Sequence, residues 1–186
     1  MDEPERSSRP QPEADDQPPP ARPGSLQVEI IDRLELVGGR VRQKLVDMAS
    51  LALAGLPNTG QVRVCIVNDR RMSIDHEKFS GITGTTDVLT FDLAPKTADF
   101  NQKILDADIT ICFDQAVRQA KRHGHSVEQE LLLYIIHGTL HCLGYNDHTQ
   151  ADYKRMHEKE DELLAQIGFG ATFFSKPDTA YKEHQS

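Results

Sequence analysis

The segment Leu131–Ile136 is an unbroken apolar run without glycine or proline, and it limits the fold more than any other part of the chain. It is far too short to span a bilayer, which takes about 20 residues. Because a helix over this run would be apolar on every side, that helix must lie in the core of a folded domain. Ser126, followed by Gln129, has the pattern of a capping box and predicts where the helix begins.

Two histidines, His137 and His141, follow four residues apart at the end of this run. Positions i and i+4 of a helix lie on one face, about 6 Å apart along the axis, so both rings can reach one metal ion. A catalytic zinc ion normally takes three protein ligands and leaves the fourth position to water. Gly144 is expected to end the helix in a left-handed turn and to bring Asp147 or His148 to the metal. The alternatives are a structural zinc site or two core histidines bonded to backbone carbonyls.

The residue after the first histidine is Gly138, and it distinguishes two classes of enzyme. Zinc peptidases of the zincin type carry Glu at this position as general base, in the motif His-Glu-x-x-His. Glycine offers no side chain that could accept a proton. The sequence therefore favours other metal chemistry over proteolysis, with a peptidase whose base comes from another segment as the alternative.

The length of 186 residues is enough for one domain with a sizeable core, with tails at both ends. Seven of the ten prolines fall within residues 1–24, which are nearly free of apolar side chains and predict a disordered leader. Residues 25–169 would form the domain, and residues 170–186 a polar C-terminal tail. The net charge of −8 argues against nonspecific coating of nucleic acid. No signal-peptide core follows Met1, so we expect a cytoplasmic protein.

Hydrophobic periodicity predicts an α+β fold with a small mixed four-stranded sheet packed with helices, one of them a zincin-like metal helix. The two strands nearest to the metal helix in sequence are expected to pair antiparallel. Strands are expected at 26–31, 61–67, 87–93 and 107–113, and helices at 37–56, at 114–122, over the metal segment and from Thr149 onward, with a weaker helical pattern at 68–79.

Two further expectations concern polar residues outside the metal segment. His123 and His125 flank a glycine, and we expect them to be solvated loop residues rather than ligands. The acidic run Glu158–Glu162 is expected to be the solvated face of the last helix.

From about Leu26 to Phe169 the chain resembles the YbeY family of bacterial rRNA maturation factors, which are metal-dependent endoribonucleases. The resemblance rests on the segments His137–His148 and Thr86–Phe91, on Asp108 with Ile109, and on Glu130 ahead of the metal helix. It implies a compact α+β fold, one zinc ion bound by three residues, and an endoribonuclease domain over residues 25–169. It also implies processing of the 3′ end of the small-subunit rRNA and ribosome quality control, with rRNA and ribosomal particles as partners and neither DNA nor a membrane.

The first departure from the family pattern concerns the third metal ligand. The family segment usually runs His-x3-His-x5-His, so Asp147 occupies the third position and His148 follows it. An aspartate oxygen is an acceptable zinc ligand, and we expect Asp147 to bind the metal. The alternative is that His148 is the third ligand. If Asp147 is the ligand, His148 is a residue that contacts it.

The second departure concerns the contact with phosphate. The family usually carries an arginine six residues before Thr86, where this chain has Ser80. A serine hydroxyl cannot replace the bidentate guanidinium, so we expect phosphate to be contacted from elsewhere, for example by Arg70 or Arg71. The alternative is that these two arginines are only solvated charges on a surface helix.

The chemistry expected from these features is metal-assisted cleavage of a phosphodiester in single-stranded RNA. The nucleophile would be either a water activated by the metal or the RNA 2′-hydroxyl, and no catalytic base is assigned from the sequence. The alternatives are a zinc metallopeptidase and a non-catalytic ribosome-assembly factor whose zinc is structural. The missing arginine favours the assembly factor somewhat.

Overall fold

The computed structural model describes residues 26–95 and 104–169. The expected leader and tail lie outside these residues. None of the helices in the described ranges combines the length and the apolar character needed to cross a membrane. Four strands and five helices are described: β1 (Leu26–Ile31), α1 (Gly39–Leu53), β2 (Gly60–Val67), α2 (Asp69–Ser80), β3 (Val88–Asp92), β4 (Leu105–Cys112), α3 (Phe113–His123), α4 (Val127–Cys142) and α5 (Gln150–Gln166).

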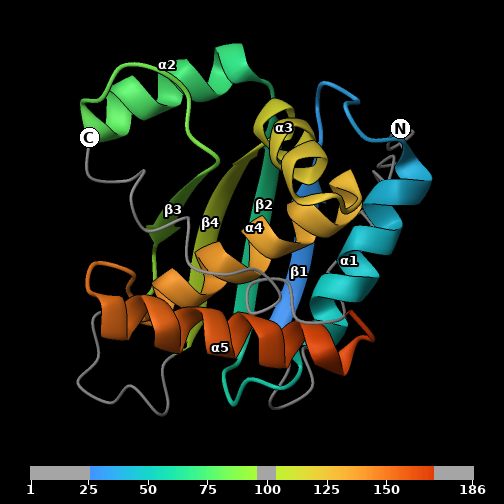
Figure 1. The fold of residues 1–186 in the computed structure, drawn as a ribbon, viewed down its shortest axis with the longest axis vertical. Helices are drawn as coiled ribbons and strands as arrows, with labels where there is room; N and C mark the ends of the chain where they lie inside the picture. Colours follow the sequence, from blue (N-terminus) through green and yellow to red (C-terminus); the bar gives the residue numbers. More distant parts are fainter. Residues whose placement is uncertain (1–25, 96–103, 170–186) are drawn as a thin grey trace, which may run out of the picture.

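The strands form one mixed sheet in the order β1-β2-β4-β3 (Figure 1). β1, β2 and β4 run parallel, whereas β3 pairs antiparallel with β4 at the edge, with Thr90 opposite Ile109. The predicted α+β fold with a mixed four-stranded sheet is confirmed, and so is the antiparallel pairing of the two predicted neighbours.

The helix α4 lies in the middle of the core. It contacts β3 and β4 on one side and α1, α3 and α5 on the others, and Figure 1 shows it crossing the front of the sheet. Every residue of Leu131–Ile136 is buried, as the unbroken apolar run predicts. The ligand-type residues at the end of α4 are therefore carried by a packed element rather than by a mobile one.

Both ends of α4 form the caps that the sequence predicts. At its start, the Ser126 side chain accepts from the backbone N–H of Gln129, and the Gln129 side chain accepts from the backbone N–H of Ser126. At its end, Gly144 has a φ of 91°, which favours glycine. The N–H of Gly144 donates to His141 O at 2.9 Å and the N–H of Tyr145 donates to Leu140 O at 3.0 Å, as in a Schellman motif. The chain reverses direction just after the second histidine.

Gly138 is the point where α4 packs closely against the sheet. A Cβ atom at this position would lie 2.8 Å from Thr90 Cγ2 and 3.0 Å from Ile109 Cγ2. Both neighbours belong to paired strands of the sheet, and Ile109 is fully buried, so neither can move away freely. Packing therefore requires glycine here, and the general-base glutamate of a zincin peptidase would have no room.

Candidate metal centre

Three donor atoms converge where α4 ends and the chain turns back. One ligand atom each from His137, His141 and Asp147 lies within 4.8 Å of the other two. The Nε2 atoms of His137 and His141 are 3.0 Å apart, and the two rings meet edge to face. The i, i+4 spacing and the glycine turn thus bring together three of the four residues predicted to bind the metal.

The other nitrogen of each ring is held by an oxygen atom. His137 Nδ1 lies 2.7 Å from Glu160 Oε1, and His141 Nδ1 lies 3.0 Å from the carbonyl oxygen of Tyr145. A ring that donates from Nδ1–H keeps its lone pair on Nε2, which is the arrangement of metal-binding histidines. The two facing Nε2 atoms can share a proton in one hydrogen bond or can both bind one cation. The donor set of two imidazoles and one carboxylate therefore fits a divalent metal ion.

Glu160 is a site residue that the sequence analysis missed. The expectation of a solvated acidic run is wrong for this residue, because its side chain on α5 is 0% exposed. Its second oxygen, Oε2, lies 2.5 Å from His157 Nδ1. A signal was available, since Glu160 has helical spacing to Met156 and Leu164, which form the buried face of α5.

Burial and charge oppose each other at these groups. Burial lowers the pKa of His137, but the hydrogen bond and the charge of Glu160 outweigh it, so this pKa is raised. Burial, and then the neighbouring His137, lower the pKa of His141. Burial raises the pKa of Glu160, but the hydrogen bonds with His137 and His157 outweigh it, so Glu160 is a carboxylate with a lowered pKa. The lowered pKa favours the neutral ring of His141, and Glu160 supplies negative charge beside His137.

The structure does not bring His148 into this group. Its side chain is 82% exposed, and its Nδ1 atom lies 3.9 Å from Asp147 Oδ1. Asp147 is half-buried and contributes the third donor atom of the group.

The residues predicted to contact phosphate lie on α2. Arg70 and Ser80 are exposed, and Arg71 pairs with Asp75 through an Nε to Oδ2 distance of 2.6 Å. Within the part of the chain that the structure describes, none of the three predicted residues forms a hydrogen bond or ion pair with the donors at the end of α4.

The groove beside Arg71 opens on the other face of the sheet. Phe91 and Asp108 line this groove together with Arg71. The helix α4 packs instead on Thr90 and Ile109, and neighbouring residues of a strand point to opposite faces. The sheet therefore separates Arg71 from the metal donors.

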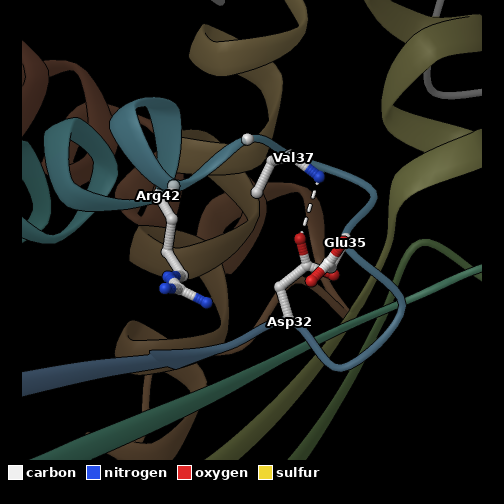
Figure 2. Close-up of a pocket in the computed structure, with 6 residues that line it drawn as sticks. Asp32, Glu35, Val37 and Arg42 are labelled. Atoms are coloured by element: carbon white, nitrogen blue, oxygen red, sulfur yellow. Dashed lines mark hydrogen bonds between the residues drawn. The ribbon is translucent and has the colours of Figure 1, made fainter.

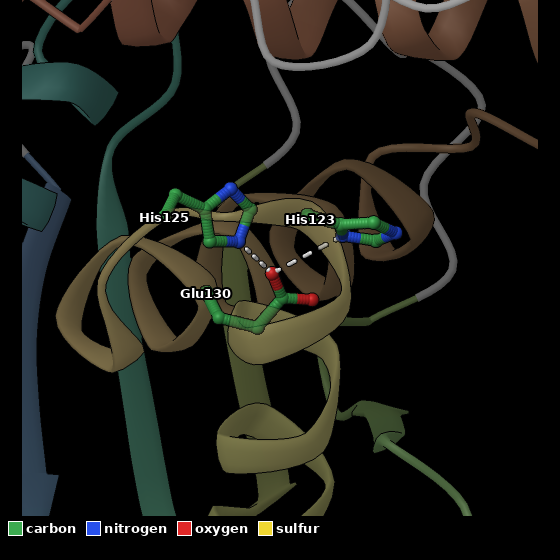
Figure 3. A group of neighbouring side chains, drawn as sticks. All are labelled: His123, His125 and Glu130. Atoms are coloured by element: carbon green, nitrogen blue, oxygen red, sulfur yellow. Dashed lines mark hydrogen bonds and ion pairs between the residues drawn. The ribbon is translucent and has the colours of Figure 1, made fainter.

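Two other groups of ligand-type side chains occur in the described ranges: His123, His125 and Glu130, and Asp69, Cys112 and Asp114. The expectation of solvated loop histidines is wrong for His125, which is largely buried and contacts Glu130 (Figure 3). In the other group, the Arg118 guanidinium donates to both oxygens of Asp69, at 2.7 and 2.8 Å. That cation already satisfies the Asp69 carboxylate.

A hollow between the end of β1 and the start of α1 is explained by the local backbone (Figure 2). Asp32 lines it and accepts from the N–H groups of Leu36 and Val37, at 3.1 and 2.8 Å. Its carboxylate thus holds the loop, and the residues that line this hollow belong to none of the three ligand groups.

Comparison with known proteins identifies similar sequences. A family model described as endoribonuclease YbeY matches residues 37–168. The endoribonuclease YbeY of Desulfitobacterium hafniense is 36% identical over 114 residues, covering 58% of this chain and 72% of the relative. That of Shouchella clausii is 30% identical over 155 residues, covering 78% and 97%. A solution structure from Thermotoga maritima aligns with a TM-score of 0.47 at 19% identity, covering 82% of this chain and 98% of that one, a similarity too low to support a conclusion.

Proposed function

Because the chain belongs to the YbeY family of metal-dependent endoribonucleases, we propose that it cleaves single-stranded RNA. The reaction serves maturation of the 3′ end of the small-subunit rRNA and ribosome quality control in the cytoplasm, with rRNA and ribosomal particles as partners. The observation that carries the proposal is the convergence of donor atoms from His137, His141 and Asp147.

His137 and His141 would hold one zinc ion through Nε2, and Asp147 through a carboxylate oxygen. When bound, the ion supplies Lewis acidity at a phosphoryl oxygen and a lowered pKa for water. Glu160 orients the ring of His137, and the Tyr145 carbonyl orients that of His141. The exposed His148 lies beside Asp147, where it can meet the ribose-phosphate chain of a bound RNA.

A zinc peptidase is the weaker alternative. The family does not supply it, and the space around Gly138 does not accommodate a glutamate base on α4. A non-catalytic assembly factor with structural zinc would differ from the proposed enzyme only in that it does not cleave RNA. Activity assays must therefore separate the two.

Arg70 and Arg71 would contact RNA phosphates beyond the cleavage site. Since the sheet lies between Arg71 and the metal donors, one RNA strand would reach both by passing an edge of the sheet, and β3 is the edge strand that contacts α4. The exposed ring of Phe79, which packs edge to face with Phe91 at 4.9 Å, offers a base a surface for stacking on that path. Ser80 ends α2 on the same path and offers only a hydroxyl.

The test uses the full-length protein, a labelled single-stranded RNA, and a precursor of the small-subunit rRNA with a 3′ extension. We expect cleavage that EDTA abolishes, that Zn²⁺ restores, and that is lost in His141→Ala. His76→Ala is the matched control, because His76 lies on α2 and contacts the Gly84 carbonyl instead of a donor of the group. Casein serves as the peptidase substrate and should stay intact.

Two results would overturn the proposal. Cleavage of casein, and not of RNA, would establish the peptidase. If His141→Ala lost its zinc but kept its fold and ribosome binding, with RNA products unchanged, the protein would be an assembly factor with structural zinc.

A further inference from the structure

His123, His125 and Glu130 form a compact cluster where α3 ends and α4 begins (Figure 3). Gly124 lies between the two histidines with a φ of 75°, and its N–H donates to Ala120 O at 2.9 Å. This left-handed turn ends α3 and lets both rings approach the same carboxylate. Glu130 comes from the first turn of α4. The cluster therefore draws its donors from both sides of one helix junction.

One oxygen of Glu130 is the common partner of both rings. His125 Nε2 contacts Glu130 Oε2, and His123 Nδ1 lies 3.8 Å from the same oxygen. The Glu130 side chain is 3% exposed, whereas those of His125 and His123 are 14% and 40% exposed. A carboxylate this deeply buried needs a positive partner. Solvent, and with it a dissolved ion, can reach the cluster from the His123 side.

A second observation points to a ligand beside Glu130. Tyr134 lies one turn further along α4 and is buried, and its hydroxyl forms no hydrogen bond of ordinary geometry with the residues that the structure describes. Burial first, and then the charge of Glu130, raise the pKa of this hydroxyl, which places the tyrosine O–H, a hydrogen-bond donor, beside the Glu130 carboxylate. A donor placed behind a carboxylate ligand is what holds that ligand in position at metal sites.

The dimensions suit a small divalent ion. Zinc binds imidazole nitrogen and carboxylate oxygen at about 2.0–2.2 Å, so tetrahedral donors lie ~3.4 Å apart. The three donor atoms of the cluster lie within 4.8 Å of one another, with one pair closer than 3.4 Å and another at 3.8 Å. Rotation of the half-exposed His123 side chain and a small shift of His125 would bring the donors to ligand distance. Two imidazoles and a carboxylate, with one position left to water, suit Zn²⁺, Co²⁺ or Ni²⁺.

We propose that His123, His125 and Glu130 form a second site for a divalent transition-metal ion, separate from the donors at the other end of α4. The ion takes the place of the hydrogen bond between His125 and Glu130 and joins α3 to α4. Because α4 also carries His137 and His141, an ion at its first turn stiffens the helix that holds both. The site goes beyond the proposed function, which requires one ion only.

The test is the zinc stoichiometry of the metal-stripped full chain, measured by equilibrium dialysis and elemental analysis. We expect two zinc ions per wild-type chain, one in His123→Ala/His125→Ala and one in His137→Ala/His141→Ala. His76→Ala should keep two. His123→Ala alone removes the most exposed ligand with the least risk to folding, and should weaken the second site at least ~10-fold, since even outer partners of a metal ligand contribute this much.

A thermal readout keeps the test independent of the first site. In folded His137→Ala/His141→Ala protein, Zn²⁺ should raise the Tm, and adding His123→Ala should abolish the rise. The proposal is wrong if His123→Ala/His125→Ala binds zinc with wild-type stoichiometry and affinity. It is equally wrong if folded His137→Ala/His141→Ala binds none, which would mean that the cluster is only a hydrogen-bonded tie between helices. Loss of zinc from the site of His137 and His141 alone would count against the proposed function, and it would leave the proposal of a second site unaffected.

Discussion

The Oε1 atom of Glu160 lies 2.7 Å from Nδ1 of His137, although the two residues are 23 positions apart and belong to different helices. This contact makes α5 part of the candidate metal centre without giving it a ligand. It also explains why a carboxylate is buried in α5, where an apolar residue would otherwise fill the space.

Replacing Glu160 with Gln should weaken zinc binding about 10- to 100-fold, the range seen when the oxygen partner of a ligating histidine is lost. The amide retains the size of the side chain but removes the charge that favours the Nδ1–H form of His137. Zinc affinity measured by competition with a chromogenic chelator checks this. Glu158→Gln, on the exposed side of α5, is the control and should bind like wild type.

Alanine at Asp147 and at His148 should have different effects on zinc. We expect Asp147→Ala to lose stoichiometric zinc, because it removes one of the three converging donors, and His148→Ala to retain it. Elemental analysis after dialysis separates the two variants. Loss of zinc in His148→Ala alone would instead assign the third ligand to that histidine.

Gly138→Ala should lower the free energy of unfolding by about 1–3 kcal/mol, the usual cost of overpacking a core. Glycine to alanine in an exposed helix has the opposite effect, by up to about 1 kcal/mol, so the sign itself reports the close packing. Adding Thr90→Ser removes the Cγ2 atom that lies 2.8 Å from the new Cβ and should recover part of the loss. Urea unfolding curves provide the measurement, and a stabilised Gly138→Ala variant would contradict the packing described.

The ion pair between Asp69 and Arg118 should make the free energy of unfolding depend on pH in the acidic range. The hydrogen bond from Arg118 lowers the pKa of Asp69 from its usual 3.8, against the effect of burial. A carboxyl group with a lowered folded pKa stabilises the fold above its unfolded pKa, and this contribution disappears as the pH falls through the folded value. Arg118→Gln should therefore be less stable than wild type at pH 6, by under about 1 kcal/mol because both groups are half-exposed, and the difference should shrink near pH 3. A difference that stayed constant between the two pH values would argue against this origin.

Local sequence signals predicted the elements that carry the site. The capping box at Ser126, the apolar run of α4 and the turn at Gly144 each depend on residues within a few positions of one another, so they could be recognised without knowing the tertiary structure. The resemblance to the YbeY family is confirmed by the family model over residues 37–168. The assignment of the individual metal ligands stays a prediction.

Features that depend on packing between distant segments were not predictable in the same way. Glu160 is buried only because α5 lies against α4, and its sequence neighbours are charged. Arg71 lies across the sheet from the metal donors because of the strand order, which charge patterns do not reveal. His125 is buried because Glu130 of the following helix turns toward it.

The Schellman turn at Gly144 divides the donors at the end of α4 into two kinds. His137 and His141 lie on the packed helix α4, whereas Asp147 follows the turn on a half-exposed loop. If these three residues hold an ion, opening of the loop would remove the Asp147 donor while both histidines kept their places on α4. The loop would then set how long a metal ion stays bound. Substitutions in residues 145–149 should change the rate of metal release more than they change the binding of the metal by His137 and His141.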